Sequence, residues 1–259
     1  MQPETKKTFK VAIQLCLICS VVVSALAVGL KGIQSSQKEA FRQQSILDAA
    51  GLWQDGVNAG EVFKQKITPV ALDLEIHGEA RTIKPGDKEL QLDVAERTPS
   101  LNDPIPPAED VAGLKKREKY TTIYEVRDGD ALKTLILPIR GKGLWSTLFG
   151  FIALDMSDAA EGPEGIKVGG ITYYRHGETP GLGGEVENQL WRDKWPGKLV
   201  YDNDWNVKVE VTKSASGDFQ VDALSGATLT SNGVTNMLKY WLGKNGFGPY
   251  VKRLAEKSK

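Results

Sequence analysis

The sequence has few of the residues from which redox and metal centres are usually built. It holds two cysteines and two histidines in 259 residues, and Cys16 and Cys19 both lie inside one apolar run. Their C-x-x-C spacing suits a redox or metal site, but within such a run we expect them to be apolar side chains. The rest of the chain has no cysteine, which excludes disulfides, iron–sulfur clusters and thiol catalysis there. His77 and His176 are too far apart to suggest a metal site, so we expect no metal ligands and no catalytic residue.

An excess of positive charge is also missing. Lys and Arg together number 33, Asp and Glu together number 33, and the formal net charge is zero. A chain without basic excess has no general electrostatic attraction for nucleic acid, which we therefore exclude as a partner. The sequence also lacks alternating βαβ units, so a Rossmann nucleotide site is not expected.

One long apolar run is present near the N-terminus. Residues 11–30 (VAIQLCLICSVVVSALAVGL) carry no charge, and as a helix they match the roughly 30 Å thickness of a bilayer core. Three lysines before the run and the small residues 25–27 (ALA) also suit a signal peptide. Because the apolar run continues to Leu30 and then meets Lys31, we favour an uncleaved transmembrane anchor. The lysines place residues 1–10 in the cytoplasm and the rest of the chain outside it.

Between the anchor and the main domain we expect a membrane-proximal exported segment, residues 31–115. Loosely helical spacing predicts an exposed helix over residues 34–52, which continues the anchor. Residues 97–110 (RTPSLNDPIPPAED) contain four prolines and predict an extended connection.

Residues 116–259 have the pattern of an α+β domain with a mostly antiparallel sheet and flanking helices, its core at about residues 141–241. Two runs of β-branched and aromatic residues flank Asp128-Gly129-Asp130, which predicts a hairpin. The expected strands are residues 120–126, 131–139, 149–154, 166–175, 198–201 and 207–211, and the expected helices are residues 185–195 and 232–242.

Three glycine-rich turns lie in this domain: residues 141–146 (GKGLWS), 176–184 (HGETPGLGG) and 222–231 (DALSGATLTS). Each follows or precedes a predicted strand and is too rich in glycine and polar residues to be core. We expect the three turns to meet at one end of the sheet and to form the wall of a ligand site. His176 would either contact that ligand or lie exposed in its loop.

The third turn suits two different structures. Gly226 and Ala227 leave room for backbone N–H groups to approach an anion, and a helix N-terminus favours a phosphate. Thr230 or Ser231 could equally cap the following helix, which would make the turn an ordinary helix start. The turn alone leaves both open, with four hydroxyls as candidates: Ser225, Thr228, Thr230 and Ser231.

The other two turns favour a ligand. Leu144, Trp145 and Leu182 could enclose a flat ring between them. Glu178 and Thr179 could form hydrogen bonds to the polar edge of that ring.

Residues 222–228 (DALSGAT) resemble the D-x-x-[S/T]-G-A-T motif of proteins that carry FMN covalently, as a phosphoester on the last threonine. The GLW and HGETPGLG turns resemble the other flavin-contacting segments of the same FMN-binding domain family. With its anchor and long exported segment, the chain is similar over nearly its whole length to the family of C subunits of bacterial sodium-translocating NADH:quinone reductases. Two alternatives stay open: the G subunit of the related Rnf complex, and a membrane-anchored binding module without redox function.

The resemblance implies a role for the chain as a carrier. A separate flavin transferase would esterify Thr228 with FMN, and the flavin would relay single electrons within a six-subunit complex that oxidises NADH, reduces quinone and pumps sodium. The complex would lie in the inner membrane with the FMN domain in the periplasm, and this subunit would itself bind no NADH, quinone or sodium. A threonine hydroxyl is a poor nucleophile and no activating set surrounds it in the sequence, so activation must come from the transferase and its metal ion. The residues expected around FMN are Thr228, Asp222, Ser225, Gly226, Ala227, Thr230, Ser231, Glu178, Thr179, Leu182, Gly183, Gly143, Leu144 and Trp145.

Overall fold

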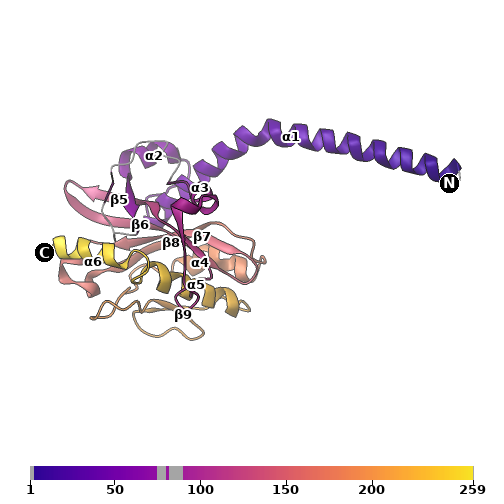
Figure 1. Cartoon of the computed structure of the whole chain (residues 1–259). Helices are drawn as coiled ribbons and strands as arrows, with labels where there is room; N and C mark the ends of the chain where they lie inside the picture. The colour runs from indigo at the N-terminus through magenta and orange to yellow at the C-terminus, as the bar shows by residue number, and fades with distance from the viewer. Residues whose placement is uncertain (1–2, 75–79, 82–89, 259) are drawn as a thin grey trace. The chain divides into compact units, whose positions relative to one another are not determined.

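The computed structural model describes residues 3–74, 80–81 and 90–258 (Figure 1). The chain forms two compact units, Met1–Arg42 and Gln43–Lys259. His77 lies outside the described residues.

The apolar run belongs to a single long helix, α1 (Pro3–Ala49), of 47 residues. Residues 6–41 are exposed, and α1 is the one described helix long and apolar enough to cross a membrane. The predicted helix at residues 34–52 is therefore the continuation of α1. Its predicted exposure is wrong at the end of α1, where Ile46 and Leu47 are 0% exposed, because they pack within the second unit.

The second unit is built on a six-stranded sheet in the order β2-β1-β5-β6-β7-β8. Every pair of neighbours is antiparallel, which confirms the predicted fold class. The predicted hairpin is also confirmed, since Asp128 faces Ala131 across a two-residue turn that Gly129 begins with φ +58°. The strands are β1 (Thr68–Asp73), β2 (Ala80–Arg81), β5 (Tyr120–Asp128), β6 (Ala131–Lys142), β7 (Thr147–Asp155) and β8 (Lys167–Arg175).

Part of the segment before residue 116 belongs to this sheet. All six residues of β1 pair with β5, from Thr68 opposite Glu125 to Asp73 opposite Tyr120. A second antiparallel pair joins β3 (Asn102–Pro104) to β4 (Lys116–Glu118), so the predicted extended connection is partly a strand. Residues on both sides of position 116 thus share one compact unit.

The predicted strands at residues 198–201 and 207–211 are wrong in extent. They form isolated bridges, Lys167 to Leu199 and Tyr201 to Val207, and only β9 (Glu210–Thr212) is a strand, parallel to β10 (Gln220–Asp222). The reason is a tight bend between the two segments. The Asp202 carboxylate accepts hydrogen bonds from the backbone of Asp204 and Asn206.

The helices also differ in part from the prediction. The expected helix at residues 185–195 is broken into a 3-10 helix, η5 (Gly183–Glu187), and a single turn, α4 (Gln189–Arg192), because the Asn188 side chain accepts from the Leu190 N–H and starts a new helix. The helix predicted at residues 232–242 is confirmed but begins at Thr228. The other helices are α2 (Ala59–Lys66), α3 (Leu92–Arg97), α5 (Thr228–Trp241) and α6 (Gly248–Lys257), with 3-10 helices η2 (Pro99–Leu101), η3 (Ala159–Glu161) and η4 (Pro163–Gly165).

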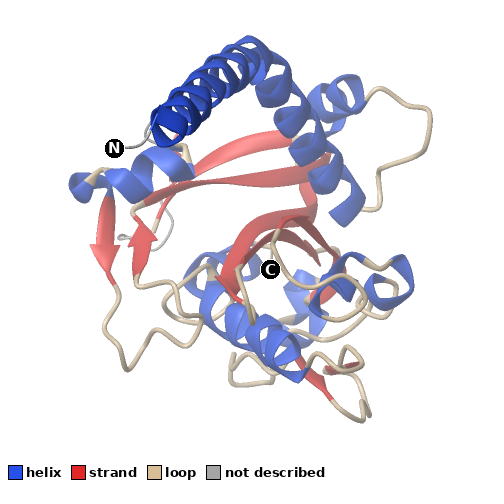
Figure 2. Cartoon of the chain, turned by 90° about the vertical axis from the view of Figure 1, so that its right-hand side faces the viewer, coloured by secondary structure: helices blue, strands red, loops and turns tan. Residues whose placement is uncertain are grey.

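Helices cover both faces of the sheet (Figure 2). On one face the end of α1 and α2 pack against Tyr124, Ile136 and Phe151. On the other face α5 and α6 share a larger core with the alternate residues of the same strands, such as Leu135 and Ile152. Burial on both faces explains why these strands read as continuous apolar runs rather than alternating ones.

The helix α5 lies close against β6, and this contact places its N-terminus. A Cβ atom at Gly233 would lie 2.3 Å from the Lys142 carbonyl oxygen, and one at Gly141 would lie 2.7 Å from the Met237 Cβ. Near the other end of α5, Trp241 Nε1 donates to the Arg140 carbonyl at 2.7 Å. The start of α5 is therefore fixed beside the turn that follows β6.

Candidate functional site

The three glycine-rich turns meet, as the sequence predicts. A Cβ atom at Gly226 would lie 3.0 Å from Leu182 Cδ2, and one at Gly183 would lie 2.5 Å from Thr230 Oγ1. The Glu178 carboxylate accepts hydrogen bonds from both the turn after β6 and the first turn of α5. Residues far apart in the sequence thus form one surface around the start of α5.

The N-terminus of α5 has no side-chain cap among the described residues. Its N-cap residue is Ala227, and no described side chain accepts a hydrogen bond there. The predicted capping by Thr230 or Ser231 is wrong, because both residues lie inside the helix and are 1% exposed. Within the described part of the chain, no side chain caps the N–H groups of the first turn, and such an arrangement favours an anion.

The four hydroxyls of the turn fall into two pairs. Thr230 Oγ1 donates to a buried carboxylate at 2.8 Å, and Ser231 Oγ accepts from a backbone N–H at 3.0 Å. Ser225 and Thr228 are exposed, and neither hydroxyl has a hydrogen bond within the described part of the chain. Thr228 is also the first residue of α5, so its hydroxyl lies beside the uncapped N–H groups.

The carboxylate that binds Thr230 belongs to Glu178, which is 6% exposed. Its Oε1 accepts from the N–H groups of Trp145 (3.0 Å) and Ser146 (2.9 Å) and from Ser146 Oγ (3.1 Å). Its Oε2 accepts from the Leu144 N–H (3.1 Å) and from Thr230 Oγ1 (2.8 Å). Both oxygens of Glu178 are engaged within the protein, and its predicted contact with a flat ring stays a prediction.

These hydrogen bonds keep Glu178 ionised. Burial by itself raises the pKa of the carboxyl, but the Thr230 hydroxyl and the three backbone N–H groups outweigh burial and hold the pKa below its ordinary value of 4.5. The ionised carboxylate therefore stabilises the folded state fully at pH values above the unfolded pKa of Glu178. This contribution to the free energy of unfolding is lost as the pH falls through the lower pKa of the folded state.

We expect the stability difference between the wild-type chain and Glu178→Gln to depend on pH in the same way. The difference in free energy of unfolding should be largest at neutral pH and should shrink as the pH falls below 4.5. Urea unfolding of both chains across this range measures it. A difference that stays constant through acid pH would contradict the ionised assignment.

Two of the glycines expected around the ligand have a steric role beside Glu178. A Cβ atom at Gly143 would lie 2.6 Å from the Glu178 Oε1, and one at Gly183 would lie 2.8 Å from its Oε2. No larger residue fits at either position unless the carboxylate moves. The close approach of Glu178 therefore explains why both positions are glycine, whether or not a ligand is bound. The predicted contact of these two glycines with a ligand stays a prediction.

Large apolar side chains are exposed on all three turns. Leu144 is 43% exposed, Trp145 69%, Leu182 44% and Leu229 59%, and Thr179 is exposed among them. Such a group of apolar side chains on a protein surface indicates a binding site. Leu229 was not among the residues predicted from the sequence, although the buried residues of α5 (Thr230, Val234, Met237, Leu238 and Trp241) leave it off the buried stripe of the helix.

Asp222 secures the other end of the third turn. Its carboxylate accepts from Lys194 Nζ at 3.0 Å and from the Ala215 N–H at 3.2 Å, and these contacts, the Lys194 hydrogen bond foremost, lower its pKa. Its backbone carbonyl accepts from Trp191 Nε1 at 2.7 Å. Lys194 was not predicted from the sequence, because it belongs to no motif and approaches Asp222 only in the fold.

One alternative predicted that His176 lies exposed in its loop, and this alternative is wrong. Its side chain is 11% exposed, and its Nε2 lies 2.9 Å from the Glu187 carboxylate. Its Nδ1 accepts from the Glu178 N–H at 3.2 Å. His176 therefore supports the loop that carries Glu178.

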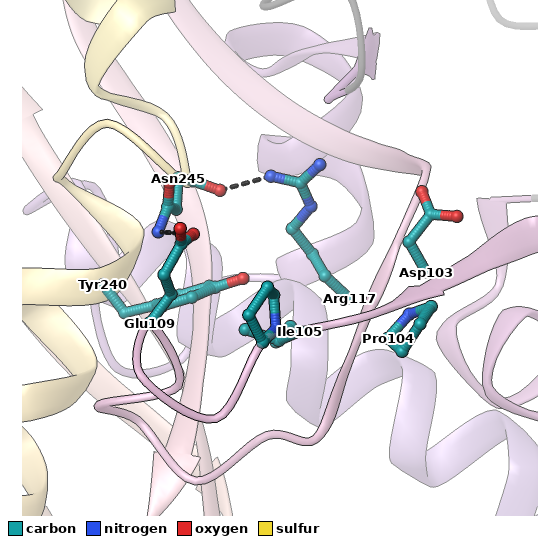
Figure 3. A pocket seen from close by; sticks show the side chains of 8 residues that line it. Asp103, Pro104, Ile105, Glu109, Arg117, Tyr240 and Asn245 are labelled. Atoms are coloured by element: carbon teal, nitrogen blue, oxygen red, sulfur yellow. Dashed lines mark hydrogen bonds between the residues drawn. The ribbon is translucent and has the colours of Figure 1, made fainter.

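A cavity of about 350 Å³ lies elsewhere in the domain (Figure 3). Arg117 and Asn245 form a hydrogen bond in its wall, and Asn245 also donates to Glu109. Tyr240 is twelve residues beyond Thr228 in α5, or about 18 Å along the helix axis. The cavity is therefore separate from the three turns. Its lining residues are Asp103, Pro104, Ile105, Pro106, Glu109, Arg117, Tyr240 and Asn245.

Comparison with known proteins agrees with this geometry. Residues 143–243 match the family model of the FMN-binding domain, and they include the second and third turns in full and the first turn from Gly143 onward. The fold and the turns thus define an FMN-binding domain joined to a long apolar helix. The chain is 43% identical to the C subunit of the Na(+)-translocating NADH-quinone reductase of Pseudomonas aeruginosa, over 98% of this chain and 97% of that one. It is 44% identical to the C subunit from Yersinia pestis, over 96% and 93% of the two chains.

The chain belongs to the family of Na(+)-translocating NADH-quinone reductase C subunits. The crystal structure of Shewanella oneidensis NqrC agrees, with a TM-score of 0.74 and 28% identity over 86% of this chain and 100% of that one. This membership favours the sodium-pump subunit over the Rnf subunit and over a module without redox function.

Proposed function

We propose that this chain is the FMN-carrying subunit of a Na(+)-translocating NADH-quinone reductase, and that Thr228 carries the FMN as a phosphoester. The observation that carries the proposal is the exposed hydroxyl of Thr228, which has no hydrogen-bond partner among the described residues and lies at the start of α5. The turns around it expose four large apolar side chains. These groups fit FMN, which combines a phosphate with a large flat ring.

Each part of the site suits one part of that cofactor. The first-turn N–H groups and the positive end of the α5 dipole stabilise the phosphate, with Ser225, Gly226 and Ala227 around it. Leu144, Trp145, Leu182 and Leu229 give the ring apolar contacts, and Thr179 offers a hydrogen bond to its polar edge. FMN supplies the electron-carrying chemistry when it is bound.

The ester bond requires help from outside the chain. Thr228 has no hydrogen-bonded base within the described residues, so nothing there removes its proton. We infer that a flavin transferase attaches FMN, and that Asp222 and the residues of the turn present Thr228 to it. Glu178, Gly143, Gly183, Thr230 and Ser231 then belong to the site as the groups that shape it.

The remaining features concern location and partners. The apolar helix α1 anchors the chain in the membrane, and the other subunits of the reductase are its partners. We infer a cytoplasmic tail at residues 1–10, a single span of the inner membrane at residues 11–30, and a periplasmic location for the segment 31–115 and the FMN domain 116–259, in a complex of six subunits. The lysines before the span support this orientation.

Intact-mass measurement of the purified full-length chain tests the proposal. Produced in a host with the flavin transferase, the chain should carry one FMN-sized mass increment and show flavin fluorescence in a denaturing gel. Produced without the transferase, the same chain should show neither. An unmodified mass from both hosts would overturn covalent attachment, and failure to co-purify with the other reductase subunits would overturn the assignment to the complex.

A further inference from the structure

The buried carboxylate of Glu178 accepts five hydrogen bonds from described residues. Its five partners are three backbone N–H groups and two hydroxyls, and they come from the turn after β6 and from the first turn of α5. Only a group that accepts at both oxygens satisfies all five donors. A glutamine of the same shape would direct an N–H₂ group at donors and leave hydrogen bonds unmade.

The elements that Glu178 joins are those that form the proposed FMN site. Thr230 lies two residues after Thr228 in the same helical turn, so the hydrogen bond from Thr230 to Glu178 fixes that turn. The bonds to the backbone of Leu144 and Trp145 fix the turn whose exposed side chains face outward. One carboxylate therefore sets the position of the attachment residue relative to the apolar side chains.

We propose that Glu178 is a positioning residue that assembles the FMN-acceptor site before the cofactor is attached. The inference rests on the proposed function, because it assigns the order in which that site forms. All five hydrogen bonds are made within the polypeptide itself, so their formation does not require FMN. The chain then meets the transferase with Thr228 and the apolar side chains already in place, and attachment does not have to order the turns.

The same geometry distinguishes a positioning role of Glu178 from a general contribution to the stability of the domain. Leu144 and Trp145 are exposed, so the turn that they occupy adds little to the core. If it is released from Glu178, water can solvate its N–H groups while the sheet and α5 stay packed. Loss of the carboxylate should therefore loosen the site far more than it unfolds the domain.

Four variants of the full-length chain test the role of Glu178. Glu178→Gln removes the charge, and Thr230→Val removes one of the five hydrogen bonds while keeping the side-chain shape. Thr230→Ser keeps that hydroxyl and should rescue the site. Glu164→Gln is the matched control, because Glu164 is an exposed glutamate of the same domain.

The first measurement is the rate at which each chain gains the FMN-sized increment after the transferase is induced. We expect Glu178→Gln and Thr230→Val to react about tenfold more slowly, the equivalent of losing one hydrogen bond to a charged group. Thr230→Ser and Glu164→Gln should react at the wild-type rate. The double variant Glu178→Gln/Thr230→Val should be no slower than Glu178→Gln alone, because the two residues act through one contact.

A second measurement needs no flavin. Trypsin should cleave the apo chain after Lys142, the exposed residue before the turn, faster in Glu178→Gln and Thr230→Val than in the two controls.

Wild-type attachment rates in both variants would overturn the inference, and so would rates that fall only in proportion to the folded fraction from urea curves. If Glu178→Gln does not fold, Thr230→Val decides the question. A wild-type chain without any increment would overturn the proposed function instead, and the trypsin result would still judge whether Glu178 holds the turn.

Discussion

Replacing Thr228 by alanine is expected to abolish FMN attachment completely. The bond is proposed to form at the Thr228 hydroxyl, and alanine offers no atom that could take its place. The fold should survive, because Thr228 is exposed and its side chain makes no hydrogen bond within the described residues. Alanine also has the higher helix propensity, so α5 should not weaken. Intact mass should therefore show the unmodified chain, with no in-gel flavin fluorescence.

The matched control is Thr228→Ser, which keeps a hydroxyl at the same position and should keep the increment. Digestion with trypsin places the modification more closely, because cleavage after Lys213 and after Lys239 releases residues 214–239, which hold all four hydroxyls of the turn. Fragmentation of that peptide should put the increment on Thr228. An increment that persists in Thr228→Ala would move the attachment to another residue, and Ser225 would be the first to examine as the other exposed hydroxyl.

Taken alone, the third turn narrows this site only to a choice between two structures. The turn at residues 222–231 suits both a capped helix start and a phosphate site, because a hydroxyl near a helix start can serve either purpose. The fold separates the hydroxyls by burial: Thr230 and Ser231 are inside, and Ser225 and Thr228 are outside. The motif resemblance singled out Thr228, but the reason that Thr230 is unsuitable lies in its contact with Glu178, 52 residues away.

Prediction of the fold from the sequence was limited in the same way. Strands with clear apolar or β-branched runs, such as β5 and β8, were predicted nearly in full, because local composition determines them. The breaks at Asn188 and Asp202 were missed because each depends on one side chain bonding to the backbone two to four residues away. The membership of β1 and the end of α1 in the domain could not be predicted, since it depends on partners more than 40 residues distant.

The end of α1 is built into the domain by several contacts. Ile46 and Leu47 are fully buried against the sheet, and the Ser45 carbonyl accepts from Thr172 Oγ1 at 2.9 Å. Asp48 forms an ion pair with Arg192 at 2.6 Å. The backbone of α1 approaches β8 so closely that a Cβ atom at Gly170 would lie 2.5 Å from the Ala49 carbonyl oxygen. The last two turns of the helix are thus part of the core.

A chain that starts at residue 36 should therefore fold as a soluble domain, whereas one that starts at residue 51 should be close to unfolding. The longer chain keeps these contacts, and Ser36 can serve as its new N-cap. The shorter chain loses two fully buried aliphatic side chains, worth about 3–6 kcal/mol together, against a total stability of about 5–15 kcal/mol for a typical protein. It also exposes the sheet face around Tyr124 and Phe151, which favours aggregation.

Urea unfolding followed by tryptophan fluorescence compares the two chains, with Leu47→Ala in the longer chain as an intermediate case. That variant should cost about 2–5 kcal/mol, the usual range for removing a buried leucine side chain. Equal unfolding midpoints for the chains starting at residues 36 and 51 would show that the helix end adds nothing to the domain. The predicted loss would mean that the boundary of the folded domain lies inside α1, so that the last two turns of this helix belong to the domain and not to the membrane anchor.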